Sequence, residues 1–400
     1  MWFRSLLTAW KSATSQSQRL QRPLRRVPRL SVEHLEDRSL PSSYSAASAS
    51  TLIADINAAN KSQGTNTITL TAVISLLTVN NNVGNLRAPS PNGLPVIAAN
   101  DKLTIIGNDE IIVRANGSNV ALRFFDVAAG ASLTLQNLTL NGGEVGGANG
   151  SEGGAIYNQG TLTLSGVSLT NNQSGSELGP PDGGAIWSNG SLTLENGTLL
   201  EGNSAQGVVA NGGLGGALYV AGGTANITNT TFTNNSALGG GPSTGDMPGG
   251  KAYGGAIYVA AGHVILTADT VNHNLTDTVN GQGAVNGALA ANGAGYGGGI
   301  YIAGGTVSLA SDTVDSNVLN GDGGYGGGIY IAGGTVTLTS DTLESNNATT
   351  SSTSHGGGVF IAKGATVYLD SFTVANTINN IDSSGTNGST ANLDGPYTLT

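Results

Sequence analysis

The sequence predicts an all-β fold, a right-handed parallel β-helix of about ten rungs with a short helix before it. Two observations lead to this prediction. A Gly-Gly-Ala/Gly motif followed by an aliphatic and an aromatic residue occurs seven times, starting at Gly153, Gly183, Gly215, Gly254, Gly297, Gly326 and Gly356. Between these motifs lie short segments in which Val, Ile, Leu or Thr alternate with other residues, without a sustained helical period.

The repeat at residues 326–347 shows how a rung is built. Three glycines turn the chain, residues 329–332 and 335–339 have the alternation of short strands, and a Ser-Asp-Thr corner follows at residues 340–342. Three short strands and three corners return the chain to its start one level higher, about 4.8 Å away. Parallel crossovers prefer the right hand, and glycine is expected at corners that need a positive φ.

Like residues recur in successive repeats and predict two inward-facing columns. The first column is Ile156, Ile186, Leu218, Ile257, Ile300, Ile329 and Val359. The second column is Leu162, Leu192, Ile227, Leu266, Leu309 and Leu338. Such columns would give a core to a chain that has 63 glycines among its 400 residues.

The remaining regions are less regular. Residues 1–49 are expected to form a disordered basic targeting leader that ends in a Ser/Ala linker, and residues 50–150 the N-terminal cap and first irregular rungs. Within that region residues 51–59 read as an amphipathic helix, capped by Ser50 or Thr51, that plugs the end of the β-helix. The seven repeats span residues 151–380, and residues 381–400 read as a tail or a poorly ordered last rung.

Composition limits the classes of function. Residues 1–40 contain eight Lys/Arg and three Asp/Glu, whereas the whole chain has a formal net charge of −10, so the body is acidic. An acidic body disfavours nucleic acid and anionic membranes as partners. Cysteine is absent, which excludes disulfides and thiolate metal sites, and no stretch reaches transmembrane length. We expect a monomer.

An aromatic column is the strongest candidate for binding. It alternates with the aliphatic column and comprises Tyr157, Trp187, Tyr219, Tyr258, Tyr301, Tyr330 and Phe360. If the aliphatic residues face inward, the aromatic residues face outward, where a sugar chain could lie on them. The alternative is ring-on-ring stacking that stiffens the sheet, and this is the interpretation we favour.

An aspartate corner raises the question of catalysis. Asp269, Asp312 and Asp341 occupy one corner of successive repeats, about 5 Å apart when stacked, which suits a glycosidase pair or a Ca²⁺ site. Other repeats have Gly197 and Thr230 there, which favours a plain turn. The four histidines show no metal-ligand spacing. We therefore predict no metal and no cofactor, with calcium as the alternative.

Two insertions occur at another corner, between an Asn and the next Gly-Gly. They span residues 237–252 and 276–295, and insertions in solenoids often lie on the binding face. If the chain were an enzyme, Asp246 and Asp277 would be the first catalytic candidates, followed by Asp312 and Asp341.

The Gly-Gly-Ala-Ile motif, paired with an aliphatic residue or Phe followed three residues later by Asn, resembles the repeat of chlamydial-type polymorphic outer membrane proteins. In this chain the second half of that pair ends at Asn172, Asn235, Asn274, Asn317 and Asn346, and after Phe372 the Asn falls one place late, at Asn376. The resemblance covers roughly residues 130–380 and implies a β-helix of the pectin-lyase type on a cell surface. Arg29 to Pro41, with Leu35-Glu36-Asp37-Arg38 at its centre, also resembles the N-terminal motif of planctomycete extracellular proteins.

Two functions of different classes remain open. The first is a secreted or cell-surface protein with a non-catalytic role in adhesion, glycan contact or structure, with a polysaccharide or a surface protein as partner. The second is a polysaccharide hydrolase or lyase of the pectin-lyase-like superfamily. Lyase chemistry on this fold needs a basic residue near a carboxylate cluster, and after Arg123 the chain has only Lys251 and Lys363.

Overall fold

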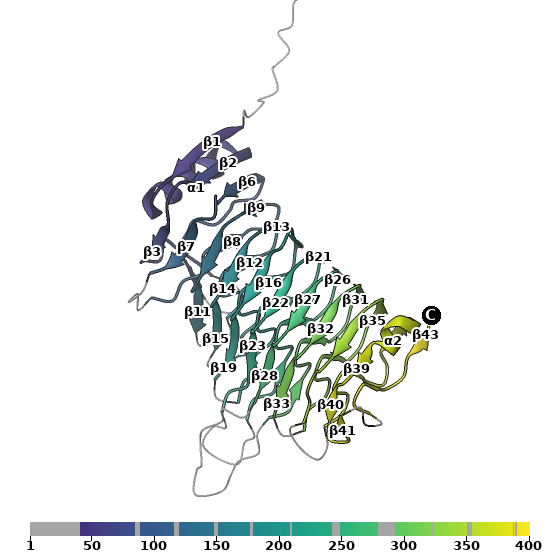
Figure 1. Cartoon of the computed structure of the whole chain (residues 1–400). Coiled ribbons are helices and arrows are strands. Elements are labelled where there is room, and N and C mark those ends of the chain that lie inside the picture. The colour runs from purple at the N-terminus through teal and green to yellow at the C-terminus, as the bar shows by residue number, and fades with distance from the viewer. Residues whose placement is uncertain are drawn as a thin grey trace, which may run out of the picture. The chain divides into compact units, whose positions relative to one another are not determined.

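The chain winds as a parallel β-helix, as the sequence predicts (Figure 1). The computed structural model describes residues 41–84, 89–115, 120–147, 151–176, 179–208, 210–241, 249–278, 293–321, 323–349, 354–386, 388 and 390–400. Strands of successive repeats pair in parallel, so that Ile257 pairs with Ile300 and Ile300 with Ile329. Four long sheets, here named A to D, hold 12, 10, 6 and 9 of the described strands.

Sheet A is the longest. Its strands are β1 (Ser42–Ala46), β2 (Gly64–Leu70), β6 (Asp101–Ile106), β9 (Ser132–Gln136), β13 (Thr161–Ser165), β17 (Ser191–Glu195), β21 (Thr224–Thr228), β26 (His263–Thr267), β31 (Thr306–Ala310), β35 (Thr335–Thr339), β38 (Thr366–Leu369) and β43 (Thr398–Leu399). Sheet B follows it in each rung. Its strands are β3 (Ile74–Leu76), β7 (Ile111–Arg114), β10 (Thr139–Asn141), β14 (Ser168–Thr170), β18 (Leu199–Glu201), β22 (Thr231–Thr233), β27 (Thr270–Asn272), β32 (Thr313–Asp315), β36 (Thr342–Glu344) and β39 (Thr377–Ile378).

Sheet C gives several rungs a fourth strand that the sequence does not predict. Its strands are β11 (Glu144–Gly147), β15 (Gln173–Ser176), β19 (Ser204–Gly207), β23 (Ser236–Leu238), β28 (Leu275–Asp277) and β33 (Val318–Asn320). Sheet D carries the aliphatic–aromatic part of the repeat. Its strands are β8 (Phe125–Val127), β12 (Ile156–Asn158), β16 (Ile186–Ser188), β20 (Leu218–Val220), β25 (Ile257–Val259), β30 (Ile300–Ile302), β34 (Ile329–Ile331), β37 (Val359–Ile361) and β42 (Leu393–Asp394).

Three two-stranded sheets complete the described strands. They are β4 (Asn81–Gly84) with β5 (Pro89–Asn92), β24 (Ala252–Tyr253) with β29 (Gly295–Tyr296), and β40 (Ile381–Asp382) with β41 (Gly385–Thr386). The predicted insertions are therefore shorter than the sequence indicates, because residues 237–238, 252, 276–277 and 295 belong to strands. Residues 242–248 and 279–292 lie outside the described residues.

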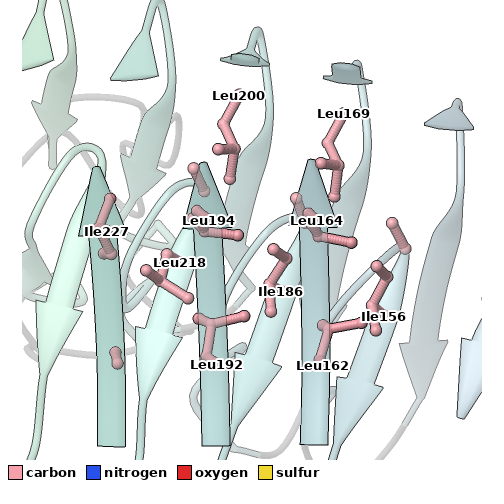
Figure 2. Close-up of a cluster of buried hydrophobic side chains, with 14 of the residues drawn as sticks. Ile156, Leu162, Leu164, Leu169, Ile186, Leu192, Leu194, Leu200, Leu218 and Ile227 are labelled. Carbon is pink, nitrogen blue, oxygen red and sulfur yellow. The ribbon is translucent and has the colours of Figure 1, made fainter. Parts of the chain in front are cut away.

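The aliphatic core is arranged in columns that run along the stack. The first predicted column is confirmed, since its members pair in register and are at most 1 % exposed. The second prediction mixes two columns. Leu162 pairs with Leu192 and Leu192 pairs with Ala225, whereas Ile227 pairs with Leu194. Both columns face inward, because positions two apart in a strand share a face; Figure 2 shows Leu162 and Leu164 on the same side of their strand.

The Gly-Gly signature has a separate steric reason at each position. The first glycine adopts a left-handed backbone, for example at Gly254 with φ 64°. The second lets neighbouring rungs approach, because a Cβ on Gly255 would lie 2.1 Å from the carbonyl oxygen of Gly298. Both requirements exclude other residues, which is why the pair recurs in every repeat.

The N-terminal end is closed by helix α1 (Ala49–Ser62), which extends the predicted helix in both directions. Its N-cap is Ser48, in a reciprocal capping box with Thr51, rather than Ser50 or Thr51. Leu52, Ile56 and Ala59 are fully buried, as predicted for a plug. Residues 42–46, which the sequence assigns to a linker, form β1 and pair with β2. The leader up to residue 40 lies outside the described residues.

The C-terminal segment forms a partial last rung. Helix α2 (Ser371–Ala375) interrupts the repeat after β38, with Asp370 as its N-cap. Beyond residue 381, β42 pairs with β37 and β43 pairs with β38. The segment that the sequence leaves as a tail or poorly ordered rung therefore continues two of the sheets.

Candidate binding face and polar ladders

The aspartate corner is a buried ladder. Asp312 Oδ1 accepts a hydrogen bond from the backbone N–H of Asp269 at 2.7 Å, and its Oδ2 accepts from the N–H of Ala310 at 3.0 Å. The same pattern recurs at Asp269, bonded by Thr230 and Thr267, and at Asp341, bonded by Asp312 and Thr339. All three side chains are at most 1 % exposed. The predicted stacking is present, but the carboxylates point into the fold.

Burial sets the protonation of this ladder. It raises the pKa of Asp269 to about 7, of Asp312 to about 6 and of Asp341 to about 7, and it outweighs the backbone N–H bonds, which favour the ionised form. Threonine occupies the same position in earlier rungs: Thr230, and Thr198 rather than the predicted Gly197. The Asp oxygens accept from backbone N–H groups, whereas the hydroxyls of Thr198 and Thr230 donate to backbone carbonyls of the same turn. Because both residue types bond to the local backbone, the ladder is explained by the turn and needs no ligand.

The asparagine corner is a second ladder with different chemistry. Asn317 Oδ1 accepts from both the backbone N–H and the side-chain amide of Asn274, and its Nδ2 donates to Asn346 Oδ1 and to the carbonyl of Val271. The ladder also includes Asn203, which the sequence reading overlooks. Its later member is Asn380 rather than the predicted Asn376, because Asn376 is the C-cap of α2. Each amide has both donors and its acceptor satisfied.

The other catalytic candidates do not join these ladders. Asp277 is half-buried at the end of β28, next to Asn320 in the register. Asp246 lies outside the described residues. Among the residues that the structure describes, no group of three or more His, Asp or Glu side chains could hold a metal ion.

The predicted aromatic column lies on the outer side of sheet D. Consecutive rings stack nearly parallel, with centroids 4.4 Å apart for Tyr157 and Trp187, 4.9 Å for Tyr258 and Tyr301, and 5.2 Å for Tyr301 and Tyr330. The stacked geometry agrees with the favoured interpretation. Each ring face in such a stack is covered by the ring of the next rung, so a sugar cannot lie flat on it.

A second aromatic row, which sequence reasoning missed, packs beside the first. It consists of Tyr253, Tyr296, Tyr325 and His355. Tyr296 meets Tyr330 edge-on at 5.2 Å and 77°, and Tyr253 meets Tyr301 at 5.0 Å and 75°. The available signal was an aromatic residue directly before Gly-Gly, five residues ahead of the first-row aromatic. Tyr157 and Trp187 of the first row are buried, at 5 % and 9 % exposure, and the other members of the two rows are half-buried, so ring edges rather than ring faces lie at the surface.

Burial also keeps the phenols neutral. It raises the pKa of Tyr253, Tyr258, Tyr301 and Tyr330 above the ordinary tyrosine value, and neighbouring tyrosines add to the effect. At physiological pH these hydroxyls therefore remain neutral hydrogen-bond donors and acceptors.

The earlier rungs of the same face are charged rather than aromatic. Arg123 is fully buried, donates to the carbonyls of Gly153 and Glu152, and lies 5.1 Å from the centroid of the Tyr157 ring. Burial lowers the pKa of Arg123, and the nearby Asp126 and Glu152 oppose this shift. Because its guanidinium is enclosed, Arg123 links neighbouring rungs through these hydrogen bonds and is not available to a ligand.

The comparisons with known proteins identify no relative. No protein-family model, no curated protein and no solved structure matches this chain. Within the described ranges, no helix combines the length and the apolar character needed to cross a membrane.

Proposed function

We propose that the protein is a secreted or cell-surface β-helix with a non-catalytic role in adhesion, contacting a polysaccharide or another surface molecule along its outer faces. One observation carries the proposal. The two ladder carboxylates among the enzyme candidates, Asp312 and Asp341, have both oxygens bonded to backbone amides and are at most 1 % exposed. A catalytic carboxyl must contact its substrate, and a substrate cannot reach these two buried carboxyls.

The outer faces suit contact better than chemistry. Sheet D presents one aromatic row, and the second row packs beside it. Aromatic residues with a polar tip are common in binding surfaces. The resemblance of the repeat to surface proteins and the extracellular-type motif at residues 29–41 support the location. A cysteine-free chain is compatible with it, because stacked rungs bury their own core.

The test is incubation of the full chain with a panel of acidic and neutral polysaccharides, with and without calcium. The proposal expects no new reducing ends and no unsaturated products. New products would overturn it, and the variant Asp277→Asn would then show whether the carboxyl beside the second insertion is responsible. A matched variant, Asp315→Asn on the outer side of β32, controls for a general effect of removing a carboxylate.

A further inference from the structure

A polar groove follows the corner between sheets D and A in the first rungs. It has a volume of about 570 Å³, within the range of ligand sites. Side chains from successive rungs line it: Asn100, Lys102, Ser132, Gln159, Thr161 and Ser191. Lys102 is the one charged residue among its lining residues.

The lining residues form a column with one polar group per rung. Lys102 pairs in register with Ser132, Ser132 with Thr161, and Thr161 with Ser191. Rungs are about 4.8 Å apart, so the groove repeats its polar groups at that interval along the axis of the β-helix. A ligand that lies in it must be elongated and must repeat on a similar scale.

Glycines occupy the corner beside the groove. A Cβ on Gly160 would lie 2.5 Å from the carbonyl oxygens of Ala128 and Ala131, and a Cβ on Gly190 would lie 2.0 Å from that of Gly160. The close approach of the rungs therefore requires glycine here. These corner positions therefore add no side chain between the polar residues of successive rungs.

Three polar side chains of the groove differ from those of the two ladders in having no hydrogen-bond partner, whereas the hydroxyl of Ser191 accepts one hydrogen bond from Thr224 and keeps its own O–H to donate. The side chains of Lys102, Ser132 and Thr161 make no hydrogen bond or ion pair with the part of the chain that the structure describes, and Lys102 and Thr161 are exposed. Donors and acceptors that the fold does not use are available to a ligand. Hydroxyl, amide and ammonium groups without an aromatic ring match a hydroxyl-rich, negatively charged chain.

We propose that this groove binds a linear, carboxylate-bearing polysaccharide that runs along the axis of the β-helix, with one of its carboxylates at Lys102. Successive sugar units meet the hydroxyls of Ser132, Thr161 and Ser191. The proposal rests on the non-catalytic contact role and gives it a place and a ligand class. The acidic body repels the polymer elsewhere, so Lys102 fixes where the chain lies.

The test is calorimetric titration of the full chain with an oligogalacturonate, and with a neutral dextran oligomer as comparison. Thr161→Trp fills the groove and should weaken binding of the oligogalacturonate about tenfold or more. Its matched control is Thr335→Trp, at the same exposed position of the same column on β35, which should change the affinity less than about twofold. Lys102→Gln should weaken binding about threefold to tenfold and remove the preference over dextran, whereas Lys363→Gln should not.

Three outcomes would overturn the proposal: no binding by the wild-type chain at millimolar ligand, equal losses in Thr161→Trp and Thr335→Trp, or binding that Lys102→Gln leaves unchanged. A melting curve for each variant shows that the fold is intact. These outcomes would refute ligand binding in the groove but not the proposed non-catalytic role. Cleavage of the ligand would refute the non-catalytic role.

Discussion

The two buried corners and the outer corner groove use similar residues for opposite purposes. In the buried corners, the carboxylate of Asp312 and the amide of Asn317 have all their acceptors occupied by the fold. In the groove, Thr161 and Lys102 are exposed and have no protein partner among the described residues. Recurrence in every repeat therefore does not identify a functional residue. The groove residues instead combine exposure with unused hydrogen-bonding capacity, which a residue that contacts a ligand needs.

The largest expected effect comes from breaking the asparagine ladder. Asn317→Ala removes the acceptor of the backbone N–H and of one side-chain N–H of Asn274, and the side-chain donor to the carbonyl of Val271. With each buried unsatisfied group costing about 1–3 kcal/mol, the free energy of unfolding should fall by roughly 3–5 kcal/mol. Denaturant unfolding measures it. Asn226→Ala, on the exposed side of β21, is the matched control and should have little effect.

The aspartate ladder should make stability depend on pH, unlike the asparagine ladder. Burial raises the pKa of Asp312 from 3.8 to about 6, so the native state holds its proton more tightly than the unfolded state. The contribution is fully present below about pH 4 and is lost as the pH rises through 6. Asp312→Asn should flatten this slope by about 2–3 kcal/mol between pH 4 and pH 7. A wild-type stability that rises over this interval by the same amount would contradict the assignment.

The fold is predictable from the sequence because each repeat contains the strand and corner pattern of one rung. The Gly-Gly pairs, the aliphatic column and the plug helix follow from sterics and burial within one repeat. The exact register of the second column does not, since Leu162 and Leu164 both face inward and either one satisfies the pattern. The second aromatic row and the groove depend on how the corners of different rungs pack against one another. The pattern within a single repeat does not specify this packing.

A smaller effect is expected on the aromatic face. Tyr301 stacks on Tyr258 and Tyr330 and meets Tyr253 and Tyr296 at their edges. Tyr301→Leu should destabilise the fold by about 1–2 kcal/mol, since aromatic pairs contribute about 0.5–1.5 kcal/mol beyond burial. Tyr301→Phe keeps the ring and should be close to wild type in thermal melting. If both variants lose equally, the hydroxyl and not the stack carries the stability.

The smallest effect is expected from shortening the second insertion. Thr278 Oγ1 donates to the carbonyl of Gly293 at 2.5 Å, so the two ends of residues 279–292 are already adjacent. Replacing these residues with a two-glycine link should change the free energy of unfolding by less than about 1 kcal/mol. Loss of soluble protein would show that the insertion contributes to the fold.

The most direct test of the account compares the full wild-type chain with Asp312→Asn for turnover and binding of oligogalacturonate. The account predicts no product from either protein and the same affinity for both, because the ladder carboxyl is structural and the groove is separate from it. Product formation by the wild type that disappears in Asp312→Asn would contradict the account, since it would make a buried ladder carboxyl catalytic.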